Sequence, residues 1–145
     1  MLNKPIPIIL DTDIGTDVDD VWALVFLLCC PELDLKLVTT STGDTEYRAR
    51  IAAKVLSAMG REDIPIGIGL HLDDCPKTHD KWLGTYSLND YGGEIITEGV
   101  GAICDQVLSS SETPTILGLV PLPNISAEIS RAPDIADLAR FVGMH

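Results

Sequence analysis

The chain has 145 residues, which is enough for one domain with a sizeable core. Hydrophobic residues make up 46% of the chain and charged residues 22%, a globular composition that argues against disorder. The net charge of −12 argues against nucleic acid or an anionic membrane as a partner, although it can attract a divalent cation. The longest apolar run, residues 21–30, has about half the length of a membrane-spanning helix. The N-terminal apolar run stops at Asp11, so we expect no signal peptide and a cytoplasmic location.

Five segments have the length and apolar composition of buried strands. They are residues 6–10, 35–41, 64–69, 115–120 and 139–144. Helical segments separate most of them, and this alternation is typical of βαβ units with parallel strands. We therefore predict one α/β domain over residues 1–145, with an open, mostly parallel Rossmann-like sheet and flanking helices. A polar loop, residues 71–93, follows the third strand.

The helices are predicted from their apolar periodicity and from the residues at their ends. They are residues 17–30, residues 45–59, residues 99–109, a short helix that begins at Asn124 with Ile125 and Ile129 facing inward, and another with Pro133 in its first turn. The helix at 17–30 is apolar on nearly all faces, so we expect it to be buried. Gly60 is expected to cap the second helix.

The four cysteines show no CxxC spacing. Cys29 and Cys30 are adjacent within an apolar run, where they are interpreted as small buried hydrophobic residues in a reducing cytosol. Cys75 and Cys104 are isolated in the sequence. A disulfide or a zinc site is therefore not predicted.

The segment DTDIGTDVDD, residues 11–20, contains five aspartates, and no Lys or Arg occurs between Lys4 and Lys36. Carboxylates crowded beside apolar segments need a cation among them. Asp13 follows the first strand, Asp20 lies in the first turn of the next helix, and Gly15 permits the sharp turn between them. The two carboxylates can thus converge, and oxygen ligands suit Ca²⁺ or Mg²⁺ rather than zinc.

This segment resembles the N-terminal signature of the inosine–uridine-preferring nucleoside hydrolases, Asp-x-Asp-x-Gly-x-(x-x)-Asp-Asp-x-x-Ala-Leu. The resemblance continues through LVTTSTGDTEYRARIAAKVLSAMGREDIPIGIG (residues 37–69) and ILGLVPLPNISAEISRAPDI (residues 116–135). It covers essentially the whole chain. The expected activity is Ca²⁺-dependent hydrolysis of the N-glycosidic bond of a ribonucleoside, which yields ribose and the free base.

The resemblance also implies roles for individual residues. Asp13 falls on the carboxylate that binds Ca²⁺ and acts as general base on a metal-bound water, and Asp20 falls on the bidentate metal ligand. Asp19 falls on a residue that hydrogen-bonds a ribose hydroxyl. Leu119 occupies the position whose backbone carbonyl completes the metal shell, and Asp44 stands beside the sugar, where many members have Asn.

Other residues are weaker candidates. The aspartate segment is two residues longer than the shorter form of the motif, so Asp17 joins Asp11 as a possible site residue. His79 and His71, in the loop at 71–93, could approach substrate or be solvated. Asn124 is expected to have a turn or capping role. Three aromatic residues could stack on a base or simply pack the loop, namely Trp82, Tyr86 and Tyr91.

Family members are roughly twice as long as this chain. The remaining half carries another metal-ligating Asp, sugar-binding Asn and Glu residues and a His beside the leaving base. We therefore expect the C-terminal part to be missing, residues 1–145 alone to be inactive, and the full-length protein to be a homo-oligomer. One alternative is a non-catalytic remnant that binds a metal or a partner. The other is a haloacid-dehalogenase-like Mg²⁺ phosphatase, but Thr16 lies one position too late for that motif.

Overall fold

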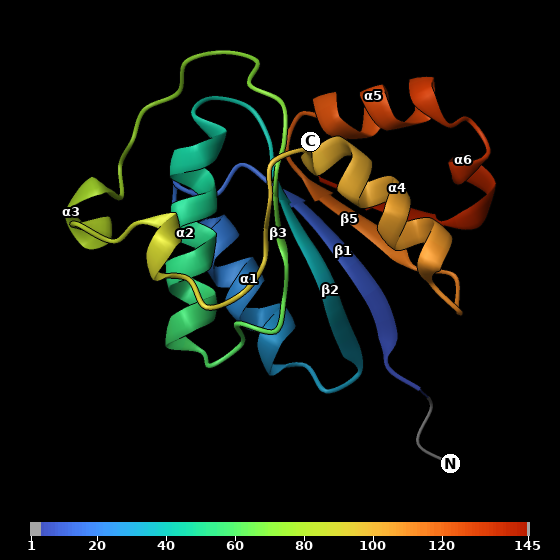
Figure 1. Cartoon of the computed structure of the whole chain (residues 1–145), viewed down its shortest axis with the longest axis horizontal. Helices are drawn as coiled ribbons and strands as arrows, with labels where there is room; N and C mark the ends of the chain where they lie inside the picture. The colour runs from blue at the N-terminus through green and yellow to red at the C-terminus, as the bar shows by residue number, and fades with distance from the viewer. Residues whose placement is uncertain (1–3, 145) are drawn as a thin grey trace.

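A computed structural model describes residues 4–144, so the end of the chain at His145 lies outside the described residues. One sheet runs through the molecule in the strand order β4-β3-β2-β1-β5-β6, and every neighbouring pair is parallel (Figure 1). The strands are β1 (Ile6–Thr12), β2 (Leu33–Thr40), β3 (Ile66–Ile68), β4 (Ile95–Ile96), β5 (Thr115–Leu119) and β6 (Arg140–Gly143). The predicted α/β class with an open parallel sheet is confirmed.

Helices cover both faces of this sheet (Figure 1). They are α1 (Asp19–Cys29), α2 (Thr45–Ala58), α3 (Asp80–Leu83), α4 (Gly99–Ser109), α5 (Pro123–Arg131) and α6 (Ile135–Leu138), with a 3₁₀ turn η1 at Leu88–Asp90. One face carries α1 and α2, with α3 and η1 packed on α2, and the other carries α4, α5 and α6. Each face has its own apolar core, because a parallel sheet must bury both sides.

The sheet has one strand that the sequence did not predict. Two residues of β4 pair with β3, Ile95 beside Ile66 and Ile96 beside Gly67. A strand of this length is too short to show any periodicity. The segment predicted as loop at 71–93 also contains α3 and η1.

The expectation that the first helix is buried on nearly all faces is wrong. Its apolar residues Leu24 and Leu27 are buried against the sheet, but Trp22 is 69% exposed and Phe26 is 67% exposed. A helix that covers one face of a sheet buries a single stripe, and residues four apart on the outer side share the exposed stripe. Cys29 is exposed as well, which corrects its interpretation as a buried hydrophobic residue.

Two smaller expectations about the later helices also need correction. The fifth helix begins at Pro123, one residue before Asn124, and Ile129 is largely exposed while Ile125 is buried. Pro133 precedes the short helix α6 and does not lie in its first turn. Gly60 follows the end of α2 with a positive φ of 68°, as a capping glycine should.

Within residues 4–144, no helix has both the length and the apolar character needed to cross a membrane. The four cysteines are free thiols.

Candidate active site

The acidic segment follows the central strand at the carboxyl edge of the sheet. Thr12, the last residue of β1, lies between Thr40 of β2 and Leu119 of β5 in the strand register. Asp13 therefore leaves the sheet beside the end of β5. Ligands of open parallel α/β sheets bind at this edge. Leu119 is the strand neighbour of Thr12, and its role as a carbonyl ligand stays a prediction.

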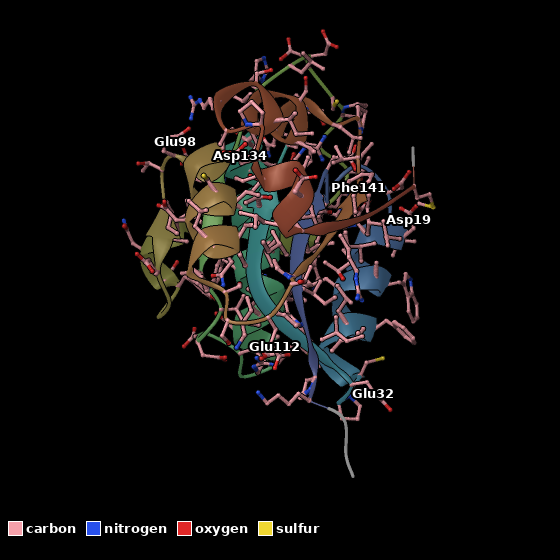
Figure 2. The ribbon with its side chains drawn as sticks, turned by 90° about the vertical axis from the view of Figure 1, so that its right-hand side faces the viewer. Asp19, Glu32, Glu98, Glu112, Asp134 and Phe141 are labelled. Atoms are coloured by element: carbon pink, nitrogen blue, oxygen red, sulfur yellow. The ribbon has the colours of Figure 1, made fainter. Side chains whose placement is uncertain are left out.

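Three aspartates form a group that could hold a metal ion. Carboxylate oxygens of Asp17, Asp19 and Asp20 lie within 4.8 Å of one another, with Asp20 buried and the other two exposed. Figure 2 shows Asp19 at the end of α1 that faces away from Glu32. Asp13 is half-buried and is not a member of this group. Asp17, which occurs in the longer form of the motif, is thus a member of the group, whereas Asp13 is not.

Asp20 is held from the strand end. Thr12 Oγ1 donates to Asp20 Oδ1 at 2.5 Å and accepts from the Ile14 amide at 3.1 Å. The Asp19 side chain in turn accepts from the Asp20 amide at 3.1 Å. The first turn of α1 is therefore fastened to the end of β1.

Burial and mutual repulsion make this group of carboxyls electrostatically unfavourable on its own. Burial raises the pKa of Asp20 to about 6, with the neighbouring charges of Asp13 and Asp19 adding to the shift. Burial also raises the pKa of Asp13. A hydrogen bond between the Asp17 and Asp19 carboxyls raises the pKa of Asp17 and lowers that of Asp19. A bound cation would oppose the raised pKa values of Asp13, Asp17 and Asp20, because opposite charge favours the ionised forms.

The buried cation of the site is Arg48, which the sequence analysis missed. Its side chain is 1% exposed, Nη1 donates to the carbonyls of Asp13 and Ile14, the latter at 3.0 Å, and Nε donates to the Thr42 carbonyl at 2.7 Å. The Arg48 charge lowers the pKa of Asp13 against the effect of burial. Arg48 lies three residues before Ile51 on the helical stripe of α2 that is buried. A charged residue on a buried stripe needs a buried partner, and this position was the signal that the sequence offered.

The carbonyls of the turn at residues 13–16 are all bound by side chains from other segments. Arg48 takes the first two, as described above. Gly15 O accepts from Tyr47 Oη at 3.3 Å and from Thr78 Oγ1 at 3.2 Å, and Thr16 O accepts from the same Thr78 hydroxyl at 2.5 Å. Gly15 has φ of 109°, and a Cβ there would lie 2.8 Å from the Tyr47 ring. The turn is therefore fixed in one conformation that only glycine permits at this position.

Asp11 lies beneath the site and not in the acidic group. It is fully buried, and its Oδ1 accepts from Thr39 Oγ1 at 2.7 Å and from Asn124 Nδ2 at 2.8 Å. Burial raises its pKa to about 6. Asn124 also donates to Thr40 O at 3.0 Å and accepts from the Leu70 amide at 2.8 Å. Its expected turn or capping role is wrong, because its side chain ties together strand ends instead of capping α5.

Asp44 is exposed and caps α2. Its Oδ1 accepts from the Tyr47 amide at 2.9 Å, and its Oδ2 pairs with Lys77 Nζ at 2.5 Å. The hydrogen bond from Lys77 holds the pKa of Asp44 below its usual range. Both oxygens therefore already have partners, and the predicted contact of Asp44 with a sugar stays a prediction.

The candidate residues of the loop at 71–93 are of two kinds: three aromatic residues pack the loop, and His79 lies beside the turn at residues 13–16. Tyr91 is buried and donates to Ile64 O at 2.6 Å, and Tyr86 shares a hydrogen bond with Ser57 at 2.8 Å. Both therefore pack the loop, as does Trp82 under the ammonium of Lys54. His79 is half-buried beside the turn, where its amide donates to Tyr47 Oη at 2.9 Å, and its role stays a prediction.

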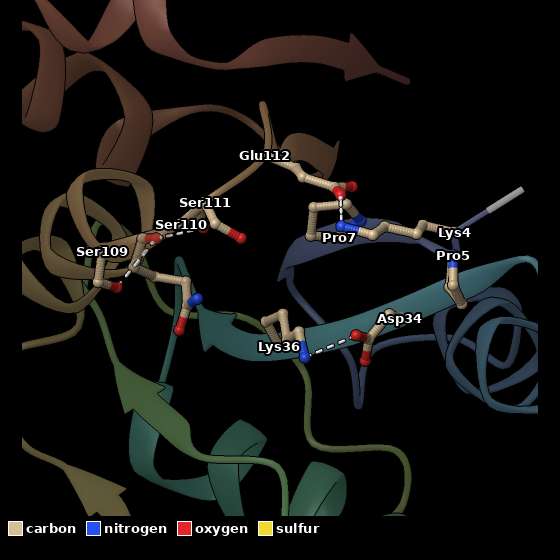
Figure 3. A pocket seen from close by; sticks show the side chains of 10 residues that line it. Lys4, Pro5, Pro7, Asp34, Lys36, Ser109, Ser110, Ser111 and Glu112 are labelled. Carbon is tan, nitrogen blue, oxygen red and sulfur yellow. Dashed lines mark hydrogen bonds and ion pairs between the residues drawn. The ribbon is translucent and has the colours of Figure 1, made fainter.

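Two cavities of the described chain lie away from the acidic group. One of about 350 Å³ is at the opposite edge of the sheet, where Lys4 pairs with Glu112 at 2.9 Å and Lys36 with Asp34 at 2.6 Å (Figure 3). An apolar one of about 270 Å³ lies between α5, α6 and β6. The acidic group is an open site at the surface.

The donors present fit a hard cation. Asp17, Asp19 and Asp20 offer oxygen atoms only, and Asp20 is a buried carboxyl whose pKa burial has raised. Carboxylates of this kind are the ligands of Ca²⁺ and Mg²⁺. The chain is therefore an α/β protein with a parallel sheet, and an acidic group that could hold a divalent cation lies at the carboxyl edge of that sheet.

Comparison with known proteins gives the family. Residues 8–144 match the family described as inosine-uridine preferring nucleoside hydrolase, and the chain belongs to it. It is 30% identical over 150 residues to the non-specific ribonucleoside hydrolase RihC of Klebsiella pneumoniae subsp. pneumoniae, covering 96% of this chain and 48% of that protein. The chain thus spans about half the length of the curated relatives it matches.

Solved structures share the fold. A plant nucleoside hydrolase, the PpNRh1 enzyme, aligns with a TM-score of 0.81 and 26% identity over 96% of this chain and 47% of its own. A purine-preferring ribonucleoside hydrolase from Gardnerella vaginalis aligns with a TM-score of 0.76 and 24% identity over 95% and 48% of the two chains. The second of these likenesses concerns the fold alone.

Proposed function

We propose that this chain carries the metal-binding half of a Ca²⁺-dependent ribonucleoside hydrolase, which cleaves the N-glycosidic bond to ribose and free base. The observation that carries the proposal is the acidic group at the junction of β1 and α1, in a chain that matches the nucleoside hydrolase family over residues 8–144. The relatives that the chain matches are named as ribonucleoside hydrolases, among them RihC, and the proposed activity follows theirs.

The residues have separate roles in this proposal. Asp20, a member of the acidic group, holds the Ca²⁺. Asp13 lies outside that group and is proposed to join Asp20 as a ligand, together with the backbone carbonyl of Leu119, whose strand neighbour is Thr12. Asp13 is the general base, since it is half-buried and lies next to the buried Arg48 charge that favours its ionised form. Asp19 is exposed at the start of α1, where its carboxylate can accept from a ribose hydroxyl.

Cleavage of an N-glycosidic bond develops oxocarbenium character at the anomeric carbon of the ribose. Carboxylates close to that carbon stabilise the developing positive charge. Bound Ca²⁺ would lower the pKa of the attacking water, so that an aspartate can take its proton near neutral pH. Asp44, which pairs with Lys77, is proposed to contact the sugar.

The test has a binding arm and an activity arm. Isothermal titration of the 145-residue chain with CaCl₂ is expected to show one site that Asp20→Ala abolishes. For activity, the chain is to replace the matching segment of the Klebsiella RihC protein, and reducing sugar released from inosine and uridine is to be measured. The chimera is expected to be active, Asp13→Asn inactive, and residues 1–145 alone inactive.

Two results would contradict the proposal. One is unchanged Ca²⁺ affinity in the Asp20→Ala variant. The other is release of phosphate from p-nitrophenyl phosphate without reducing sugar from either nucleoside, which would favour the phosphatase alternative. Turnover by residues 1–145 alone would confirm the reaction and show that this half suffices.

A further inference from the structure

Arg48 joins the ends of two neighbouring strands beneath the acidic site. Its Nη1 donates to the turn after β1, at Ile14 O (3.0 Å) and Thr16 Oγ1 (3.1 Å), while its Nε donates to Thr42 O (2.7 Å), beyond the end of β2. The side chain itself comes from the first turn of α2. One rigid guanidinium therefore sets the distance between the two loops that border the site.

Three backbone carbonyls depend on this guanidinium. Asp13 O and Ile14 O accept hydrogen bonds from Nη1, and Thr42 O accepts one from Nε. In the described part of the chain, and leaving aside the strand pairing, none of these three carbonyls has a second donor. Leaving a carbonyl without a donor is unfavourable, so the turn would rearrange if Arg48 were lost. Thr42 already holds a positive φ of 61°, which is unfavourable for a non-glycine residue.

We propose that Arg48 is a positioning residue for the cation of the acidic site, an inference that rests on the proposed function. Arg48 does not bind the cation. It holds the carbonyls of Asp13 and Ile14 on the α2 side of the turn and thereby fixes the backbone that carries the Asp13 carboxylate, whose charge acts on Asp20. Nη2 is buried without a hydrogen-bond partner, and a Cβ on Gly43 would lie 3.1 Å from it.

Positioning and electrostatics predict opposite effects of substitution at this residue. If the Arg48 charge merely opposed a cation, Arg48→Met would tighten Ca²⁺ binding and Arg48→Lys would leave it unchanged. Lysine has a single ammonium on a flexible stem, so it cannot reach Thr42 O and the turn at the same time in fixed geometry. If Arg48 positions the turn, both variants bind Ca²⁺ more weakly.

The experiment is Ca²⁺ titration by calorimetry of the wild-type chain, Arg48→Lys and Arg48→Met, with melting temperatures for each. Arg50→Lys is the matched control, since Arg50 lies on the same helix and donates to Tyr86 O at 2.9 Å, away from the turn. We expect Arg48→Lys to weaken binding roughly tenfold or more, which is the usual effect of losing a residue that orients a ligand. Arg50→Lys should bind as the wild type does.

A second measurement needs no metal. The Ile14 amide donates to Thr12 Oγ1 at 3.1 Å, so its hydrogen exchange reports the order of the turn. In metal-free Arg48→Lys this amide is expected to exchange faster while amides of β2 do not. If Arg48→Lys fails to fold, Thr16→Val is measured in its place. That change removes one acceptor of Nη1 and leaves the guanidinium in place. The Thr16→Val variant is then expected to bind Ca²⁺ several-fold more weakly than the wild type.

Wild-type affinity in a folded Arg48→Lys or Thr16→Val variant overturns the inference and leaves the proposed function intact. So does tighter binding by Arg48→Met, or weaker binding with unchanged exchange at Ile14. Absence of Ca²⁺ binding by the wild-type chain contradicts the proposed metal site and this inference together.

Discussion

Asn124 donates its side-chain amide to the Asp11 carboxylate at 2.8 Å, although the two residues are 113 positions apart in the chain. Through Thr40 O and the Leu70 amide, the same side chain also reaches the ends of β2 and β3. The carboxyl edge of the sheet is thus held together by one buried amide. Gly69 must lack a side chain for this contact, because a Cβ there would lie 2.3 Å from the amide nitrogen of Asn124.

Asn124→Leu is expected to destabilise the fold by about 2–4 kcal/mol, since it removes the donors of Asp11 and Thr40 O and the acceptor of the Leu70 amide. Urea unfolding followed by circular dichroism measures the change. Asn89→Leu, at an exposed position of η1, is the control and should remain within about 0.5 kcal/mol of the wild type. Equal stability of the two variants would show that the buried amide does not hold the sheet edge.

The pH dependence of Ca²⁺ binding should report the carboxyl of Asp20. Because its pKa is about 6 in the metal-free protein, protons compete with the cation and the affinity should fall as pH drops below about 6. The Thr12 hydroxyl lowers that pKa, so Thr12→Val should move the fall to higher pH. Calorimetry between pH 5 and pH 8 tests this, with Thr115→Val, at the far end of β5, as control. Identical profiles for the two variants would contradict it.

Asp44 caps α2 through the Tyr47 amide and pairs with Lys77, and two substitutions can separate the contributions of these contacts to stability. Asp44→Ala removes the acceptor of the Tyr47 amide and should cost about 1 kcal/mol of stability. Asp44→Ser keeps a capping oxygen but loses the ion pair with Lys77, and its stability should stay close to the wild-type value. Urea titration of both variants measures the difference. A loss in Asp44→Ser as large as in Asp44→Ala would assign the stability to the ion pair instead.

Glu128 is a buried carboxyl that the proposed function does not use. It is 1% exposed, neither of its oxygens has a hydrogen-bond partner of good geometry, and its neighbour Cys104 offers only a weak thiol donor. Burial raises its pKa, so the folded state holds the proton more tightly than the unfolded chain. The ionised form therefore destabilises the fold, and this penalty is absent in acid and grows as pH rises above 4.5.

Glu128→Leu should accordingly stabilise the protein at pH 7 by roughly 1–3 kcal/mol, and by less at pH 4. Thermal melts of the variant and the wild type at both pH values measure the difference. Glu112→Leu, at an exposed position, is the comparison for removal of a negative charge. A gain that does not change between pH 4 and pH 7 would argue against an ionised Glu128 as its source.

Much of the fold could be predicted because its elements have strong local signals. The helix at 99–109 has the predicted bounds, and the alternation of strands and helices was enough for the parallel sheet. The place of the aspartates followed from that topology, since the carboxyl ends of parallel strands share one edge. Arg48 and the Asp11–Asn124 contact could not be predicted, because they depend on side-chain contacts between segments distant in sequence. The outer stripe of α1, with Trp22 and Phe26, contradicted the rule that apolar residues are buried.

The first strand of the chain lies in the middle of the sheet, between β2 and β5. During synthesis, the aspartate segment therefore leaves the ribosome long before β5, the strand that becomes its neighbour. If Leu119 supplies a ligand as proposed, the cation site needs Leu119 in place beside Thr12, and a nascent N-terminal segment is expected to have low affinity for the ion. A ligand that binds only the finished sheet stabilises it by mass action. Calcium would then act on this chain as a late folding ligand, one that selects the native arrangement rather than starting it.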